Sequence, residues 1–180
     1  MRIDKDKALA IFIDYQEKLL PAQFDRVRFI DNSVKLAIGL ISLDVPIIVS
    51  EQYPKGLGTT VDDLKNISGF PDGMPKTSFS CMLDEDIKNA VKQSGAKHII
   101  ISGCETHVCV LQTVIDLIEM GLSVYLVTDC CTSRTQANHN IGIERAKQEG
   151  AFVSSLEEIL FELQRVAGGD TFKTISNLIK

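Results

Sequence analysis

The sequence predicts an α/β protein in which helices cover both faces of a doubly wound, mainly parallel sheet of about six strands. Short continuous apolar runs, such as residues 8–13 and 98–101, are typical of strands buried on both faces. Segments with apolar residues at helical spacing alternate with these runs, as at residues 110–118. Strands that alternate with helices form parallel sheets with right-handed crossovers, so we expect a three-layer α/β/α arrangement.

Length and composition limit the possible organisation. With 180 residues, of which 44% are hydrophobic, residues 1–180 are expected to form one domain around one core. The net charge of −5 argues against nucleic-acid binding, which usually needs a basic face. No stretch reaches the roughly 18 apolar residues of a membrane span, and the charged N-terminus lacks a signal-peptide apolar region. The five irregularly spaced cysteines favour reduced thiols and a cytoplasmic location.

The first elements follow from the order of apolar and polar residues. Residues 8–13 form an apolar run that ends at Asp14, as a central parallel strand would. The next helix is expected to begin at Asp31 or Asn32, either of which can cap it. A second strand is expected at residues 47–50.

Residues 51–75 are rich in proline and glycine and are expected to be irregular, apart from a short helix at 61–65. An edge strand fits residues 76–80. A helix at residues 85–94 should end at Gly95.

Residues 102–109 read Ser-Gly-Cys-Glu-Thr-His-Val-Cys and join the apolar run 98–101 to the amphipathic segment 110–118. This stretch is predicted to be a strand-to-helix crossing, with Cys109 in the first helical turn. Unpaired N–H groups and the positive end of the helix dipole meet there. We expect these groups to favour the thiolate form of Cys109, which is the nucleophilic form.

The last third predicts a strand at 123–127, a helix at 137–149, a short strand at 152–153 and a helix at 156–166. After two glycines, residues 170–180 form a predicted helical tail. About eleven residues do not hold a helix alone in water, so the tail must be covered, by its own domain or by another subunit. We favour another subunit, and hence a homo-oligomer. The apolar stripe of the tail consists of Phe172, Ile175, Leu178 and Ile179.

Three polar residues are expected to meet at one edge of the sheet. Asp14 ends the first strand, Lys76 lies at the edge strand, and Cys109 follows the central run. Ligands bind at the carboxyl edge of open α/β sheets. A lysine can stabilise a thiolate, and a carboxylate can take the thiol proton and later activate water. Backbone N–H groups in the turn before Cys109 could stabilise an oxyanion.

Five segments carry a family resemblance, in the order 13–16, 76–80, 103–113, 129–134 and 150–153. They resemble the isochorismatase-like superfamily of cysteine hydrolases. Residues 51–58 and the tail resemble a subgroup named only for its isochorismatase domain, without a settled substrate. The resemblance covers the chain from about residue 8 to about residue 161.

The resemblance implies a Rossmann-like fold and a catalytic triad of Asp14, Lys76 and Cys109. It implies hydrolysis of C–N bonds in small amides or carbamoyl compounds through a thioester acyl-enzyme. It also implies a cis peptide at Cys104–Glu105, which would direct the N–H groups of Glu105 and Cys109 toward an oxyanion.

Two differences from known family members limit the reactions that we expect this chain to catalyse. Nicotinamidases carry an Asp-x-His metal motif where this chain has Glu51-Gln52-Tyr53, so the resemblance implies no metal and no cofactor. Isochorismatases cleave a vinyl ether without a cysteine nucleophile, so Cys109 disfavours that reaction. The substrate itself, expected to be a small molecule, is not readable. Weaker candidates for lining its pocket are Gln16, Glu51, Gln52, Tyr53, Leu57, Phe79 and His107.

Other interpretations stay open at this point. The chain could be a vinyl ether hydrolase, or a catalytically idle scaffold or small-molecule binder. It could be a thiol redox protein, although it lacks Cys-x-x-Cys spacing. A zinc site is disfavoured because two of the four cysteines concerned are adjacent. Those cysteines are Cys104, Cys109, Cys130 and Cys131.

Overall fold

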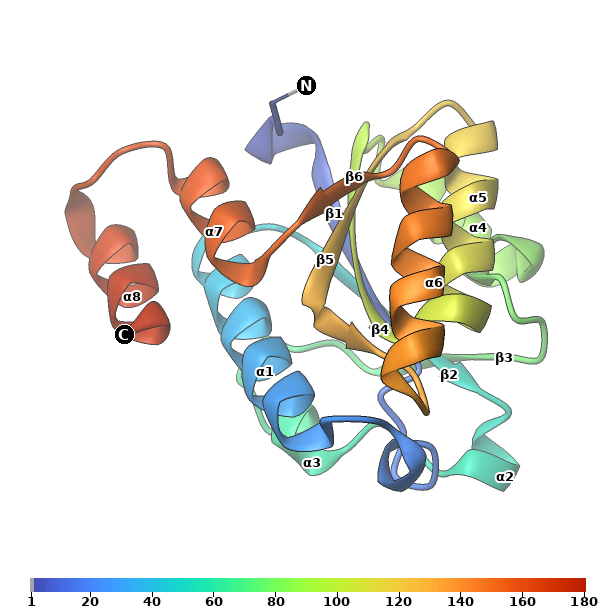
Figure 1. Ribbon diagram of the computed structural model, residues 1–180. Helices are drawn as coiled ribbons and strands as arrows, with labels where there is room; N and C mark the ends of the chain where they lie inside the picture. The colour runs from blue at the N-terminus through green and yellow to red at the C-terminus, as the bar shows by residue number, and fades with distance from the viewer. Residues whose placement is uncertain (1) are drawn as a thin grey trace.

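The computed structural model describes residues 2–180 and contains a six-stranded parallel sheet with the order β3-β2-β1-β4-β5-β6. Helices cover both faces of this sheet (Figure 1). The α/β class predicted from the sequence is therefore confirmed. The strands are β1 (Ala8–Ile13), β2 (Ile47–Gln52), β3 (Gly73–Lys76), β4 (His98–Cys104), β5 (Ser123–Thr132) and β6 (Phe152–Ser154).

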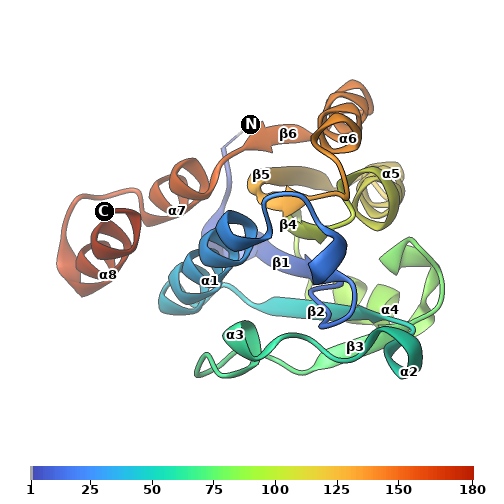
Figure 2. The same cartoon turned by 60° about the horizontal axis from the view of Figure 1, so that its bottom comes forward.

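Two groups of helices form the outer layers, and Figure 2 shows them on opposite sides of the sheet. One layer contains α1 (Arg26–Ser42), α7 (Leu156–Gln164) and α8 (Gly169–Ile179). The other contains α4 (Glu85–Gln93), α5 (Leu111–Glu119) and α6 (Gln136–Gln148). Short helices α2 (Pro54–Leu57) and α3 (Asp62–Lys65) and 3₁₀ turns at Lys5–Lys7, Leu20–Ala22 and Cys81–Leu83 complete the elements, with a π-helical turn at Thr106–Val110.

Strand β1 lies at the centre of the core because both of its faces are apolar. Its even-numbered side chains pack with the α1 layer, and its odd-numbered ones pack with the α5 layer. Every residue of the strand is buried. The first set is Ala8, Ala10 and Phe12, and the second is Leu9, Ile11 and Ile13.

Several predicted boundaries are wrong. Helix α1 begins at Arg26 rather than at Asp31 or Asn32, and Asp25 at its N-cap makes no side-chain capping bond. Strand β3 ends at Lys76 instead of beginning there. Its Pro75 is tolerated because β3 is an edge strand. Helix α7 ends at Gln164 because Arg165 takes a positive φ of 66°.

The direction in which strands are added to the sheet reverses at β1. The chain first adds β2 and β3 on one side of β1 and then adds β4, β5 and β6 on the other side. This is the topological switch point, where open α/β sheets bind ligands. Gly103 allows β4 to approach β1 closely there, since a Cβ on Gly103 would lie 2.2 Å from the Ile13 carbonyl oxygen. Its φ of 135° is also a conformation that side chains rarely allow.

The C-terminal helix α8 packs on its own chain, against α1 and α7 (Figure 1). Ile175 is fully buried, and the rings of Phe161 and Phe172 are 6.4 Å apart. The preference for a tail that crosses to another subunit is therefore wrong for this structure. Along residues 2–180, no helix combines the length and the apolar character that a membrane span requires.

Candidate active site at the carboxyl edge of the sheet

The three residues singled out from the sequence meet at the switch point. Asp14 directly follows β1, Lys76 is the last residue of β3, and Cys109 lies in the π-helical turn after β4. All three are buried, with exposed fractions of 0%, 2% and 6% respectively. The Lys76 Nζ donates to Asp14 Oδ2 at 2.9 Å, and the Cys109 thiol lies close enough to the same carboxylate for Asp14 to raise its pKa. The arrangement places an ammonium and a carboxylate in direct contact, with a thiol beside them.

Lys76 is surrounded by oxygen acceptors. Its Nζ donates to Asp14, to Gln52 Oε1 at 2.6 Å, and to the carbonyl oxygens of Ser78 and Phe79 at 3.2 and 3.1 Å. Burial alone would lower the pKa of Lys76, but the charge of Asp14, the nearby Cys109 and Cys81 and the hydrogen bond to Asp14 together outweigh it, and the pKa is raised. The side chain is therefore an ammonium at neutral pH.

Asp14 sits in a position of positive φ, 58°, at the end of β1. Burial raises the pKa of Asp14, while the charge of Lys76 and hydrogen bonds from Lys76 and Ser50 offset part of the rise. The Ser50 hydroxyl donates to Oδ1 at 2.8 Å. A carboxylate with a raised pKa is a better proton acceptor than a free one, which suits a general base.

The expectation that Cys109 rests as a thiolate is wrong. Burial, together with the charge of Asp14, raises the pKa of the Cys109 thiol above its ordinary value, and Lys76 opposes this only in part. The dipole argument failed because the depth at which Cys109 is buried, the main cause of the raised pKa, was not readable from sequence position. The resting form is the thiol, with Asp14 placed to take its proton.

Cys109 lies in a turn of unusual geometry. Residues Thr106–Val110 form a π-helical turn, not the first turn of an α-helix, and α5 starts two residues after Cys109. The preceding Cys104–Glu105 peptide bond is cis. Cys104 is buried, and its sulfur donates to the Asp14 carbonyl oxygen at 3.1 Å. Cys104 thus connects β4 to the end of β1.

Two of the weaker candidates are occupied by structural hydrogen bonds. The Gln16 amide donates to the carbonyl oxygens of Gln52 and Gly58, at 2.9 and 2.7 Å, and accepts from the Gln52 N–H. Both of its N–H donors are therefore used. Glu51 Oε1 accepts from the backbone N–H and hydroxyl of Thr60, at 2.7 and 2.8 Å. These side chains hold the loops around the site, and Gln52 holds Lys76.

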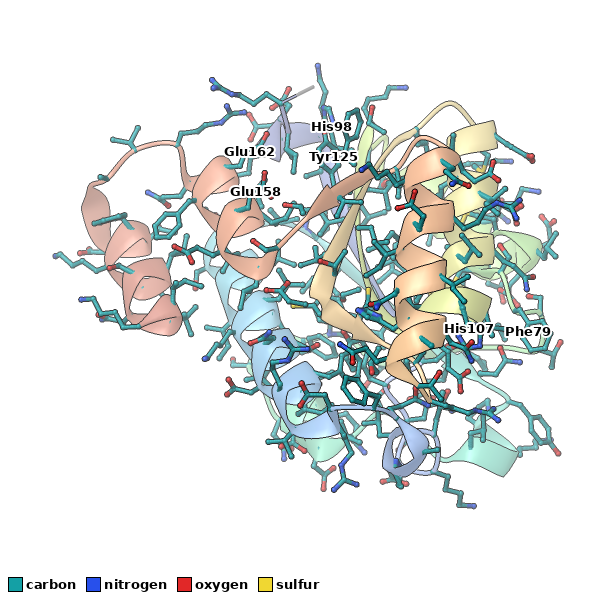
Figure 3. All side chains as sticks on the ribbon, viewed as in Figure 1. Phe79, His98, His107, Tyr125, Glu158 and Glu162 are labelled. Atoms are coloured by element: carbon teal, nitrogen blue, oxygen red, sulfur yellow. The ribbon has the colours of Figure 1, made fainter. Side chains whose placement is uncertain are left out.

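The outer candidates are more accessible. Tyr53 and Phe79 are 54% and 53% exposed, and Leu57 is half-buried. His107 Nδ1 lies 3.0 Å from the Ser133 hydroxyl. Figure 3 shows Phe79 and His107 at the end of the molecule where the strands of the sheet end. A cavity of about 320 Å³ borders the site and is lined by Tyr53, Pro54, Lys55, Pro75, Lys76, Thr77 and Asp84.

The sequence interpretation missed two hydroxyl groups that support the site. Ser50 donates to Asp14, as described above. The buried Thr113 hydroxyl donates to the Cys109 carbonyl oxygen at 2.7 Å and accepts from the Cys81 N–H at 3.0 Å. A polar residue at the carboxyl end of an apolar strand could have signalled Ser50, but nothing in the sequence distinguishes Thr113 from a helical core position.

All five cysteines are unpaired thiols. Within residues 2–180, no group of three or more histidine, cysteine, aspartate or glutamate side chains could hold a metal ion. The zinc interpretation of the four cysteines therefore has no support.

Known proteins resemble the chain over nearly its whole length. The isochorismatase domain family matches residues 8–158. Isochorismatase domain-containing protein 2A of Mus musculus is 34% identical, over 99% of this chain and 85% of its own. The solved MAR1 ribonuclease of Caenorhabditis elegans is 34% identical, with a TM-score of 0.90 and coverages of 99% and 92%. The YcaC gene product of Escherichia coli, titled an octameric hydrolase of unknown specificity, is 27% identical, with a TM-score of 0.93 and coverages of 99% and 89%.

The family match spans most of the chain, and it includes the ends of β1, β3 and β4, where Asp14, Lys76 and Cys109 lie. The resemblance noted from the sequence motifs is confirmed, and the chain belongs to the isochorismatase family.

Proposed function

We propose that this chain is a metal-independent cysteine hydrolase that cleaves a C–N bond in an amide or carbamoyl group of a small molecule. The observation that carries the proposal is the buried ion pair of Asp14 and Lys76 beside the buried Cys109 thiol at the switch point. A thiol beside a carboxylate provides a nucleophile and its general base. A scaffold or binder would gain nothing from burying a charged pair next to a thiol, because that burial carries a desolvation cost.

In the acylation step, Asp14 takes the thiol proton while the Cys109 sulfur forms a bond to the carbonyl carbon. The C=O electron pair moves onto oxygen and gives a tetrahedral oxyanion. When the C=O bond re-forms, the C–N bond breaks, and the nitrogen leaves with the proton held by Asp14. Lys76 stays charged and stabilises the negative charge as it passes between the carboxylate and the sulfur.

Deacylation reverses the roles with water. Asp14 takes a proton from water as the oxygen attacks the thioester carbon. Collapse of the second tetrahedral species breaks the C–S bond, and the Cys109 sulfur recovers its proton from Asp14. One carboxylate therefore acts as base and acid in both halves of the cycle.

The oxyanion would be held by backbone N–H groups of Glu105 and Cys109, which belong to the Cys104–Glu105 turn and the π-helical turn. Backbone donors are well suited to this task, because they are already fixed in position before the charge develops. Tyr53, Leu57, Phe79 and His107 would line the substrate pocket.

The relatives add support at a coarser level. The E. coli relative is titled a hydrolase and an octamer, which favours a hydrolase and a homo-oligomer here. The C. elegans relative is titled a ribonuclease. The net charge of −5 on this chain disfavours a polyanionic substrate. The five unpaired thiols favour a reducing, cytoplasmic location.

A hydrolysis screen tests the proposal. Small amides, N-carbamoyl compounds, isochorismate and an RNA oligonucleotide would be offered to the wild-type protein, and quenched samples analysed by mass spectrometry. We expect ammonia or an amine to be released, and an acyl group on the peptide that contains Cys109. Turnover of isochorismate or RNA without modification of Cys109 would overturn the proposal.

A further inference from the structure

The turn before Cys109 carries a buried carboxylate that the proposed chemistry does not use. Glu105 is only 6% exposed. Its Oε1 accepts from Arg134 Nε at 2.7 Å and from Gln23 Nε2 at 3.3 Å. His107 Nε2 lies 3.7 Å from Oε2. A buried carboxylate needs such partners, because an unpaired charge in this position would be costly.

The backbone of the same residue controls the position of Cys109. The Glu105 carbonyl oxygen accepts from the N–H groups of Val108 and Val110, at 3.0 and 3.2 Å. These two residues flank Cys109 in the chain. A movement of Glu105 would therefore shift both sides of the nucleophile and the N–H group of Glu105 itself.

Arg134 holds the Glu105 carboxylate from the solvent-exposed side of the turn. It lies just after β5, and its side chain is 67% exposed, whereas that of Glu105 is 8% exposed. The hydrogen bond and the charge of Glu105 raise the pKa of Arg134, as expected for an ion pair. The neighbouring Ser133 hydroxyl contacts His107 at 3.0 Å. Residues 133–134 therefore hold the turn at two points.

We propose that Arg134, acting through Glu105, is a positioning residue that holds the oxyanion-binding N–H groups in place. This inference rests on the proposed function. Oxyanion contacts form only in the transition state, so their loss lowers kcat and leaves KM unchanged. Attack on a carbonyl should therefore depend on Arg134, whereas alkylation of the same sulfur should not, because alkylation forms no oxyanion.

The experiment compares two reactions of the full-length protein. Arg134→Gln is expected to lower the rate of Cys109 acylation by p-nitrophenyl acetate by about tenfold, less than the loss of a whole oxyanion donor. KM for this ester and the rate of Cys109 alkylation by iodoacetamide should stay within about twofold of the wild type. Arg134→Lys, which keeps the charge, should recover part of the loss.

Arg145→Gln is the matched control, because Arg145 also pairs through Nε with a glutamate, Glu149, and is 55% exposed. It should change neither reaction. The inference is overturned if Arg134→Gln acylates as fast as wild type, or if alkylation slows as much as acylation. Cys109→Ala distinguishes a failure of the proposed function from a failure of the role of Arg134. Ester turnover that survives in Cys109→Ala, or a wild type that is never acylated, contradicts the proposed function and the inference with it.

Discussion

The carboxyl edge of the sheet and the C-terminal helix α8 are held in place by different forces. At the edge, Asp14 and Lys76 are buried charges whose polar atoms are paired with fixed partners. Helix α8 is attached through apolar contacts, with Ile175 at their centre. Among the described residues, the side-chain hydrogen bonds of α8 stay within α8 itself.

The difference has a physical consequence. A buried charge that loses its partner lowers the free energy of unfolding of the whole domain. A terminal helix held by apolar contacts can instead detach locally and leave the core intact. We therefore expect changes at the edge to affect chemistry and global stability, and changes in α8 to affect only local order. The following predictions test this separation, from the largest expected effect to the smallest.

Cys109→Ala should abolish hydrolysis, with a loss of at least about 10³-fold, because no other group can form the thioester. The free energy of unfolding should fall by only about 1 kcal/mol, since a small buried side chain is replaced by a smaller one. Activity assays and urea denaturation measure the two effects. Cys81→Ala is the control, since it removes another buried thiol from the same core cluster that is not one of the proposed reacting groups. Full activity in Cys109→Ala would remove the basis of the mechanism.

Lys76→Met should lower the free energy of unfolding by about 3–5 kcal/mol, because it leaves Asp14 buried without its cation. Urea denaturation of the single and double variants measures the coupling. Adding Asp14→Asn should recover much of the stability but none of the activity. Equal stability of Lys76→Met and wild type would mean that the pair is not the buried contact described here.

The acid limb of the pH profile of kcat/KM should be centred above 3.8, the ordinary pKa of an aspartate, because burial raises the pKa of Asp14. The base form of Asp14 is needed, so kcat/KM falls as pH drops through that raised pKa. On the alkaline side, deprotonation of Lys76 should cause no loss of kcat/KM below pH 10.5, the ordinary pKa of a lysine, because the pKa of Lys76 is raised. Steady-state rates across pH measure both limbs, and a limb centred below 3.8 would exclude Asp14 as the base.

Ile175→Ala should loosen α8 and leave catalysis within about twofold of wild type. Removing a fully buried isoleucine side chain costs about 2–5 kcal/mol of local packing, which the tail cannot recover elsewhere. Hydrogen exchange should become faster in α8 and stay unchanged in β1. Lys173→Ala, at an exposed position of the same helix, is the control. A parallel loss of activity would show that the tail and the edge are coupled after all.

Extensive EDTA treatment should have the smallest effect, with no change in rate beyond error. Asp14 is paired with Lys76, and in the part of the chain that the structure describes no group of three or more histidine, cysteine, aspartate or glutamate side chains could hold a metal ion. Assays before and after chelation, with metal analysis of the purified protein, check this. Recovery of a chelated, inactive sample by zinc would overturn the metal-independent mechanism.

Much of this edge was readable from the sequence because strand ends are local signals. The apolar runs that end at Asp14 and lead into Cys109 identified two strands and the side of the sheet at which they end. Helix α1 was misplaced because its first turn lacks a capping side chain and relies on packing of Phe29, which no local pattern reveals.

The thiol was misjudged for a similar reason. The sequence predicted that Asp14 and Lys76 lie near the thiol, but not how deeply the assembled sheet buries it, and burial is the main cause of its raised pKa. The same holds for Glu105, whose partners Gln23 and Arg134 come from remote segments. The identity of the reacting groups was a local property of the sequence, while their protonation and support were not.

The missing side chain at Gly103 has a consequence for how this protein tolerates mutation. Gly103 is not one of the proposed reacting residues, yet a Cβ there would lie 2.2 Å from the Ile13 carbonyl oxygen and push β4 away from β1. Asp14 directly follows β1 and Cys109 follows β4. Any substitution of Gly103 would therefore increase the distance between the Asp14 carboxylate and the Cys109 sulfur. In a saturation mutagenesis library, position 103 should be as intolerant as the nucleophile itself. Selection at position 103 would then preserve the distance between two strands, whereas selection at Cys109 preserves a reactive group.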